Sequence, residues 1–370
     1  MSEKNERLLS IDVLRGFDMF FIIGGASLIS ALCSAFGFGD GWLAGQMKHV
    51  EWAGFAHHDT IFPLFLFLAG VSWPFSLASQ EAKGRSPWQI RLKALKRGVI
   101  LFLFGLSFGG ILKFKPDFRL MSVLGFIGIC WTVAALMFMQ IRRASTRILT
   151  VALPLVGFWA LLSFCIAPDA PAGVDSYSLK GNIVSYLDRL VYPNHLLKKN
   201  VYEPESLFSV PNGAALAFIG MCIGSLLKNE TLGKARKTAL LSGWALVLLV
   251  LGAVFHLALG DQIIKKLWTT SFVLYASAYS TAMLALFHWL VDVKGFRAWT
   301  APFMEIGRNS ITIYLFMMLG IQGLLARFLF SGLSEWAGAP WTRVVMACAS
   351  LFIGWFFVHF LHRRNIFLKV

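Results

Sequence analysis

The sequence predicts an all-α, polytopic bundle of about ten membrane-spanning helices, with both ends of the chain in the cytoplasm. Of its 370 residues, 57% are hydrophobic and only 14% are charged, whereas roughly one-quarter of a soluble domain is charged. The mean hydropathy is +0.67. The apolar residues form long runs, unlike the short alternating segments of a transmembrane β-barrel.

Ten apolar segments are candidate spans, because a helix needs roughly 20 apolar residues to cross a bilayer. They cover residues 13–35, 61–79, 98–113, 121–141, 148–167, 208–227, 238–260, 269–291, 310–330 and 343–361. Glycine is frequent in them, as is usual where helices pack closely in lipid. The segments 98–113 and 343–361 are short or unevenly bounded, so the expected number of spans is ten, give or take one.

The distribution of lysine and arginine between the connections predicts the orientation of the chain in the membrane. With the N-terminus inside, almost every inner connection carries a basic cluster, and the inner side holds roughly twice as many basic residues as the outer side. The first cluster lies between residues 83 and 97, and the last lies at the C-terminus. The net charge of +15 is therefore a topology signal, and we expect no nucleic-acid partner.

The chain is expected to form a single integral-membrane domain over residues 1–370. Its longest connection, about residues 168–207, is predicted to fold over the outer membrane face. The N-terminus lacks a clear signal-peptide cleavage site, so we expect the first helix to be retained. The five scattered cysteines are interpreted as small buried hydrophobes, without a disulfide or metal role.

The densest polar stretch lies just before the second candidate span. It contains His49, Glu51, Trp52, His57, His58 and Asp59. Ionisable groups at a membrane boundary are costly to hold and usually serve chemistry or transport. A histidine with a carboxylate nearby is typical of a general base or an acyl-accepting nucleophile. His49 and Trp52 would be one helical turn apart.

Other interpretations of this stretch stay open. The histidines could form a metal site, although no HExxH motif or Cys/His spacing is present, or they could lie at the interface without a role. His57 and His58 point to different faces of a helix or strand, so at most one joins His49. Asp59 could also simply cap the helix that enters at Ile61.

Two further polar elements lie at the start of candidate spans. At the N-terminus, Ser10 can cap the first helix, while Asp12 and Arg15 can pair at i, i+3 or Arg15 can hold a phosphate or carboxylate. Later, Asn309 begins the ninth span, where an asparagine is more often a cap than a ligand. Among nucleotide and hydrolase motifs, neither a Walker loop nor GxGxxG nor GxSxG is present.

Three early elements have recognisable patterns: S-x-D-x-x-R-G at Ser10–Gly16, H-x-x-W-x-G at His49–Gly54, and D-x-x-F-P-x-F-x-F at Asp59–Phe67. They resemble the heparan-α-glucosaminide N-acetyltransferase family. Later elements that also resemble it include Gly181–Asn182, Pro204–Leu207, Lys265–Leu274 and Gly307–Tyr314. The resemblance covers nearly the whole chain and is nearest to a bacterial branch carried as a domain of unknown function.

The resemblance implies an acetyltransferase that uses cytosolic acetyl-CoA as donor and acts on the periplasmic side of the bacterial inner membrane. His49 matches the active-site histidine, and Asp59 matches the carboxylate that follows it. The chain departs from many members at residues 24–27 and 123–126. These departures concern the acceptor more than the acyl chemistry. For so compact a chain, resembling a bacterial branch, we expect an amino sugar or other cell-envelope glycan as the acceptor and not heparan.

We expect coenzyme A and the acceptor to be held by polar residues at the span ends, without a metal. The predicted coenzyme A residues are Asp12, Arg15, Arg119, Lys265, Lys266, Trp268 and Ser271. The predicted acceptor residues are Glu51, Trp52, His58 and Asn309. The coenzyme A nucleotide is expected near Arg15 at the inner face, with Arg119, Lys265 and Lys266 as the outer alternative.

Two other functions remain as alternatives to the acyltransferase. A transporter of a small envelope precursor usually has interrupted helices and polar residues deep in the membrane. These spans are nearly free of charges, which favours an enzyme with its site at the helix ends. A catalytically inactive binding member of the family is the other alternative. The sequence leaves a homodimer open.

Overall fold

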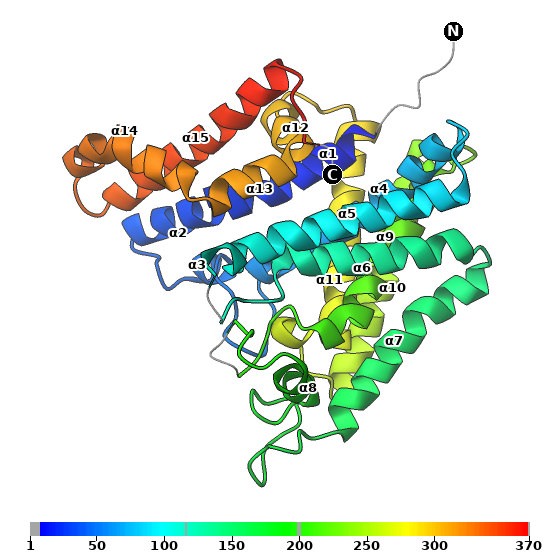
Figure 1. Cartoon of the computed structure of the whole chain (residues 1–370). Coiled ribbons are helices and arrows are strands. Elements are labelled where there is room, and N and C mark those ends of the chain that lie inside the picture. The colour runs from blue at the N-terminus through cyan, green and yellow to red at the C-terminus, as the bar shows by residue number, and fades with distance from the viewer. Residues whose placement is uncertain (1–7, 115–116, 198–200, 369–370) are drawn as a thin grey trace.

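The computed structural model describes residues 8–114, 117–197 and 201–368, and it confirms the all-α prediction. Within the described residues, the extended structure is limited to one isolated bridge between Ile166 and Asn182. Figure 1 shows the long helices packed side by side, with the short helix α8 and its loops at one end of the bundle.

In chain order the helices are α1 (Leu9–Phe20), η1 (Phe21–Gly25), α2 (Ala26–Ala35), α3 (Trp42–Gln46), α4 (His57–Glu81), α5 (Pro87–Phe108), η2 (Ile111–Lys113), α6 (Val123–Gln140), α7 (Ala144–Phe164), α8 (Ile183–Val191), η3 (Leu207–Ser209), α9 (Val210–Lys228), α10 (Lys234–Ala253), η4 (Val254–Ala258), η5 (Lys265–Leu267), α11 (Thr270–Phe287), η6 (His288–Val293), α12 (Thr300–Arg308), α13 (Ser310–Met318), α14 (Ile321–Ala337) and α15 (Thr342–Arg363).

In the described part of the chain, eight helices are long and apolar enough to cross a membrane. The count becomes nine if α13 and α14, which are bent by 69° relative to each other, form one broken span. The one expected segment that is not counted, 98–113, falls mainly in α5. That helix has 22 residues but carries four basic side chains in its first half, which keeps it outside the count.

The centre of the bundle is built by helices that approach one another at glycine. α4 packs against α9, where a Cβ at Gly70 would overlap the Ala217 carbonyl oxygen and a Cβ at Gly224 would overlap the Val71 carbonyl oxygen. Such small residues let helix backbones come close in lipid. Because α4 is fixed in this way, the side chains at its start have a defined position.

The first span is interrupted. Gly24 has φ of 140° inside η1, so α1 and α2 are separate segments of one span. α1 packs against α12, and α2 packs against α15. In Figure 1, α2, α14 and α15 form a group at the left of the view. The break therefore turns the second half of the first span toward the C-terminal helices.

The start of α1 differs partly from the expectation. The N-cap position is Leu8, and the buried Ser10 hydroxyl has no hydrogen-bond partner among the described residues, so the predicted Ser10 cap is wrong. The predicted contact of Asp12 with Arg15 is confirmed, with Arg15 Nη1 at 3.4 Å from Asp12 Oδ1. The N-cap residue of α1 therefore provides no side-chain cap bond.

Candidate active site

His49 and Asp59, which the sequence singled out, are in direct contact. His49 Nδ1 lies 2.8 Å from Asp59 Oδ1, and the Val50 N–H donates to Asp59 Oδ2 at 3.3 Å. α4 begins at His57, two residues before Asp59, instead of at Ile61 as expected. The Asp59 carboxylate makes no hydrogen bond to the first turn of α4, so its alternative role as a helix cap is wrong.

Lys265 is the third member of this cluster. Its Nζ lies 3.1 Å from His49 Nδ1 and 3.5 Å from Asp59 Oδ1. Asp59 is only 1% exposed, and a buried carboxylate needs a partner charge or hydrogen bonds to remain ionised. Burial lowers the pKa of Lys265, and the carboxylates of Asp59 and Glu205 oppose that shift. The lysine thus balances the charge of Asp59.

The contact with Asp59 orients the His49 ring. A ring nitrogen offers one hydrogen-bonding site, either an N–H or a lone pair. When Nδ1 carries its hydrogen, it donates to Asp59 Oδ1, and Nε2 is the ring nitrogen left for a substrate. The His49 side chain is 52% exposed. The cluster therefore presents an oriented imidazole to a substrate.

Trp52 forms a wall beside this cluster. Its Nε1–H donates to the Tyr177 carbonyl oxygen at 2.9 Å, and its ring meets that of Tyr202 at 5.5 Å. Lys266 lies against both rings and donates to the Glu51 carbonyl oxygen. Residues 51–54 form bends instead of a helix, so the expected helical turn between His49 and Trp52 is wrong.

The two adjacent histidines diverge as predicted. The His58 ring lies 4.4 Å from the His49 ring. The His57 ring instead contacts Tyr279, whose hydroxyl is 2.9 Å from His57 Nδ1. Only His58 therefore joins the His49 cluster, which confirms that at most one of the pair could do so.

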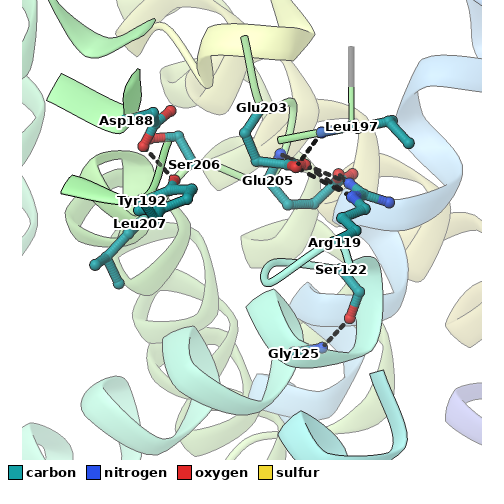
Figure 2. Close-up of polar contacts among 10 residues, drawn as sticks. All are labelled: Arg119, Ser122, Gly125, Asp188, Tyr192, Leu197, Glu203, Glu205, Ser206 and Leu207. Atoms are coloured by element: carbon teal, nitrogen blue, oxygen red, sulfur yellow. Dashed lines mark hydrogen bonds and ion pairs between the residues drawn. The ribbon is translucent and has the colours of Figure 1, made fainter. Parts of the chain in front are cut away.

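Arg119 is held by two carboxylates (Figure 2). Its guanidinium donates to both oxygens of Glu203 and to Glu205. Glu203 also accepts from the Leu197 N–H at 3.0 Å. Burial raises the pKa of Glu205 to about 7, and Arg119 acts against this shift. The guanidinium thus ties Glu203 and Glu205 to the connection before α6.

A second network in Figure 2 fixes the same loop from α8. Asp188 Oδ1 accepts from the Tyr192 hydroxyl and from Ser206 Oγ, the latter at 2.8 Å. Asp188 is fully buried, and burial raises its pKa to about 7. The two networks together hold the segment that carries Tyr202 against Trp52.

Asp188 is expected to make stability depend on pH. Its folded-state pKa lies above that of an unfolded aspartate, so the folded state retains a proton that the unfolded state has lost. The contribution of Asp188 to the free energy of unfolding is then greatest below about pH 4, and it falls as the pH rises to about 7. In detergent melting curves, the melting temperature of Asp188→Asn relative to the unmodified protein should rise by several degrees between pH 5 and pH 8.

The matched control for this experiment is the exposed Asp117. Asp117→Asn should keep the pH dependence of the unmodified protein. If Asp188→Asn also kept it, the buried carboxyl would not be protonated at neutral pH.

Two predicted coenzyme residues are enclosed by protein. Trp268 is 1% exposed and packs its ring against those of Phe62 and Phe126. Ser271 is fully buried; its N–H donates to Asp261 Oδ2 at 2.6 Å, and its hydroxyl donates to the Gln262 carbonyl oxygen. Both stabilise the loop that positions Lys265, and their ligand roles stay predictions.

The remaining predicted residues gather around α1 and α12. Arg15 donates to Ser72 Oγ of α4 at 2.7 Å, and Arg308 Nε lies 3.6 Å from Asp12 Oδ2. Asn309 is 2% exposed and occupies the N-cap position of α13 without a side-chain cap bond. Asp59 and Ser72 are thirteen residues apart on α4, hence about 20 Å along the helix axis. The predicted site residues therefore form two groups.

Sequence reasoning did not assign the residues that support the His49 cluster. Tyr177, Tyr202, Glu203 and Asp261 lie in loops far from His49 in sequence. The Pro204–Leu207 pattern indicated that this loop mattered, but no spacing rule linked it to Arg119. Among the described residues, no three His, Cys, Asp or Glu side chains are arranged to hold a metal ion.

Fold and site together define an all-helical membrane protein with a buried carboxylate, a lysine and an accessible histidine at one end of its helices. The chain is similar to the human heparan-alpha-glucosaminide N-acetyltransferase, with 26% identity over 368 residues that cover 84% of this chain and 52% of the human protein. The mouse protein of the same name is also 26% identical over 84% of this chain and 53% of its own length.

This homology confirms the resemblance seen in the motifs and supports an acetyltransferase family. The chain spans about half the length of the curated relatives it matches. No family model matches the sequence.

Proposed function

We propose that the protein is an acetyltransferase that moves an acetyl group from cytosolic acetyl-CoA to an amino sugar of a cell-envelope glycan on the periplasmic side of a bacterial inner membrane. The contact of His49 with Asp59 and Lys265 carries this proposal. In its neutral form with Nδ1–H donated to Asp59, this imidazole has a lone pair at Nε2, which suits both a general base and an acyl-accepting nucleophile.

The acyl-carrier route needs two balanced steps. The Nε2 lone pair attacks the thioester carbonyl, an N–C bond forms, the C–S bond breaks, and the coenzyme leaves as a thiolate that takes a proton from water. The acceptor amine then attacks the acetyl-imidazole, the bond between Nε2 and the acetyl carbon breaks, the proton lost by the amine passes to the hydroxide left by the first step, and His49 is regenerated. In the general-base route, His49 Nε2 instead takes the proton of the amine while the amine attacks the thioester directly.

Asp59 and Lys265 have distinct roles in either route. The Asp59 carboxylate holds the Nδ1 hydrogen and stabilises the positive charge that develops on the ring. Lys265 lies within ion-pair distance of Asp59. Its ammonium keeps the buried carboxylate from being an uncompensated charge.

The donor is proposed to extend from the Arg15 group to His49. The pyrophosphate and 3′-phosphate of coenzyme A need cationic or N–H donors. Arg97 Nε and Asn309 Nδ2 are buried donors without a hydrogen-bond partner among the described residues. The pantetheine arm reaches about 15–20 Å when extended, which is comparable to the separation along α4 between Ser72 and Asp59.

This arrangement favours the inner-face position of the nucleotide. Arg119, from the outer alternative, is bound by two carboxylates, Glu203 and Glu205, whereas Arg15 shares the Asp12 carboxylate with Arg308. The connection 168–207, whose Tyr177 and Tyr202 contact Trp52, is proposed to cap the outer face.

The function is tested with the purified protein in lipid nanodiscs. Radiolabelled acetyl-CoA is added together with glucosamine, galactosamine or muramic acid. We expect label on the amino group of at least one sugar, and label on His49 when the acceptor is omitted if the acyl-carrier route operates. Transfer of no label to sugar or protein would contradict the proposal and favour the transporter or the inactive binding protein.

Arg15→Gln is expected to weaken acetyl-CoA binding by about tenfold or more, because a charge-assisted hydrogen bond contributes about 1.5–3 kcal/mol. Binding is measured by equilibrium dialysis of the labelled coenzyme. Lys266→Gln, at the other group, serves as the matched control and should retain affinity. A loss of affinity only in Lys266→Gln would overturn the inner-face position.

A further inference from the structure

An open cavity of about 720 Å³ lies between α2 and the C-terminal helices α14 and α15. These three helices form the group at the left of Figure 1. The volume is within the usual range for small-molecule sites. Methionine, alanine and phenylalanine side chains line part of it, and serines of α2 line another part.

The charged residues of the cavity have one sign. Three cationic side chains line it, namely Lys48, Arg327 and Arg343, and no lining residue among those described is acidic. All three are exposed. Within the described residues, none of the three side chains has a hydrogen-bond or ion-pair partner. Such a cavity complements an anion, and arginine in particular matches phosphate geometry.

The cavity also reaches the candidate active site. His58 lines it, and the His58 ring lies 4.4 Å from the ring of His49. Lys48 lines it as well and directly precedes His49 in the chain. A ligand that extends through the cavity from the arginines to Lys48 would therefore reach His58, whose ring lies beside that of His49.

The surroundings favour an amphiphile over a water-soluble anion. Beside Arg327, α14 exposes Leu324, Phe328 and Leu329, which is the surface expected of a lipid-facing helix. Met47 and Met346 lie in the lining itself. Cations next to apolar surface suit a ligand whose phosphate is attached to an alkyl chain.

We propose that this cavity docks a lipid phosphate, and that the acceptor sugar is presented to His49 while linked to that lipid. The phosphate binds Arg327, Arg343 and Lys48, the alkyl chain lies along α14, and the sugar extends past His58. The inference about the acceptor rests on the proposed function, whereas the docking of a lipid phosphate can be measured without acetyl transfer.

The probe is dodecyl phosphate, and its binding to the full-length protein in nanodiscs is measured by calorimetry in the absence of acetyl-CoA. We expect the double variant Arg327→Gln/Arg343→Gln to bind it at least tenfold more weakly. Lys180→Gln, an exposed cation that does not line the cavity, should bind it unchanged. Ser27→Trp should block the cavity, while Ser145→Trp on exposed α7 should not.

Inorganic phosphate and dodecanol separate the sources of affinity. Both should bind much more weakly than dodecyl phosphate. If inorganic phosphate bound equally well, the site would be one for a soluble anion and the lipid inference would be wrong. Binding that was insensitive to both arginines and to Ser27→Trp would also overturn it.

The same measurements separate this inference from the proposed function. If dodecyl phosphate binding depends on the two arginines while no sugar is ever acetylated, the docking site stands and the acyl chemistry is wrong. If sugars are acetylated while dodecyl phosphate fails to bind, the docking site is wrong and the acyl chemistry stands.

Discussion

His49→Ala is expected to lower acetyl transfer by at least about 10³-fold. Loss of a positioned acid–base group typically costs 10²–10⁴-fold, and loss of the acyl carrier would remove the whole route through it. His49 is the only member of its cluster that is more than half exposed, so it is the one a substrate can reach. Transfer is measured with labelled acetyl-CoA and the best sugar acceptor.

This variant should remain folded. Removing the exposed imidazole leaves Asp59 with the Val50 N–H and the Lys265 ammonium as partners. Its detergent melting temperature should therefore stay close to that of the unmodified protein. His362→Ala is the matched control, because His362 lies near the end of α15, about 30 Å along the helix from Arg343. Near-normal turnover of His49→Ala would remove this histidine from the mechanism.

Asp59→Asn is expected to lower transfer by about 10²–10⁴-fold, as replacement of the carboxylate behind a catalytic histidine does elsewhere. The amide cannot hold the Nδ1 hydrogen with the same charge, and it leaves Lys265 without its anionic partner. A carboxylate neighbour favours the protonated imidazole. The acidic limb of the pH–rate profile should therefore move to lower pH in the variant.

Two comparisons make this result specific. Asp169→Asn changes an exposed carboxylate that pairs with Arg189, and it should alter neither the rate nor the profile. Lys265→Met should slow transfer through the same cluster while it leaves the His49 contact to Asp59 intact. An unchanged pH–rate curve in Asp59→Asn would show that Asp59 does not act through His49.

Several local features were predictable from the sequence because they depend on neighbouring residues. Long apolar runs predicted the spans, since each must be helical to satisfy its backbone in lipid. The i, i+3 spacing predicted that Asp12 contacts Arg15, as the structure confirms. Helical geometry also predicted that His57 and His58 diverge, and only His58 contacts His49.

Local expectations failed where tertiary contacts outweighed them. Serine is a favoured N-cap residue, but the helix begins one residue before Ser10 and buries its hydroxyl. Asp59 lies in the first turn of α4, where a carboxylate favours the helix dipole, yet its side chain turns to His49 and Lys265. A buried charge is stabilised more by direct partners than by a helix end, which explains the outcome.

The sequence by itself determined the class of fold, the candidate histidine and its carboxylate, because these follow from composition and from motifs within a short stretch. Only the tertiary structure decided what completes the site. Lys265 is 216 residues from His49, and Arg119 is 84 residues from Glu203. Pairings at such separations depend on how α4, α9 and α11 pack, and no local periodicity encodes that packing.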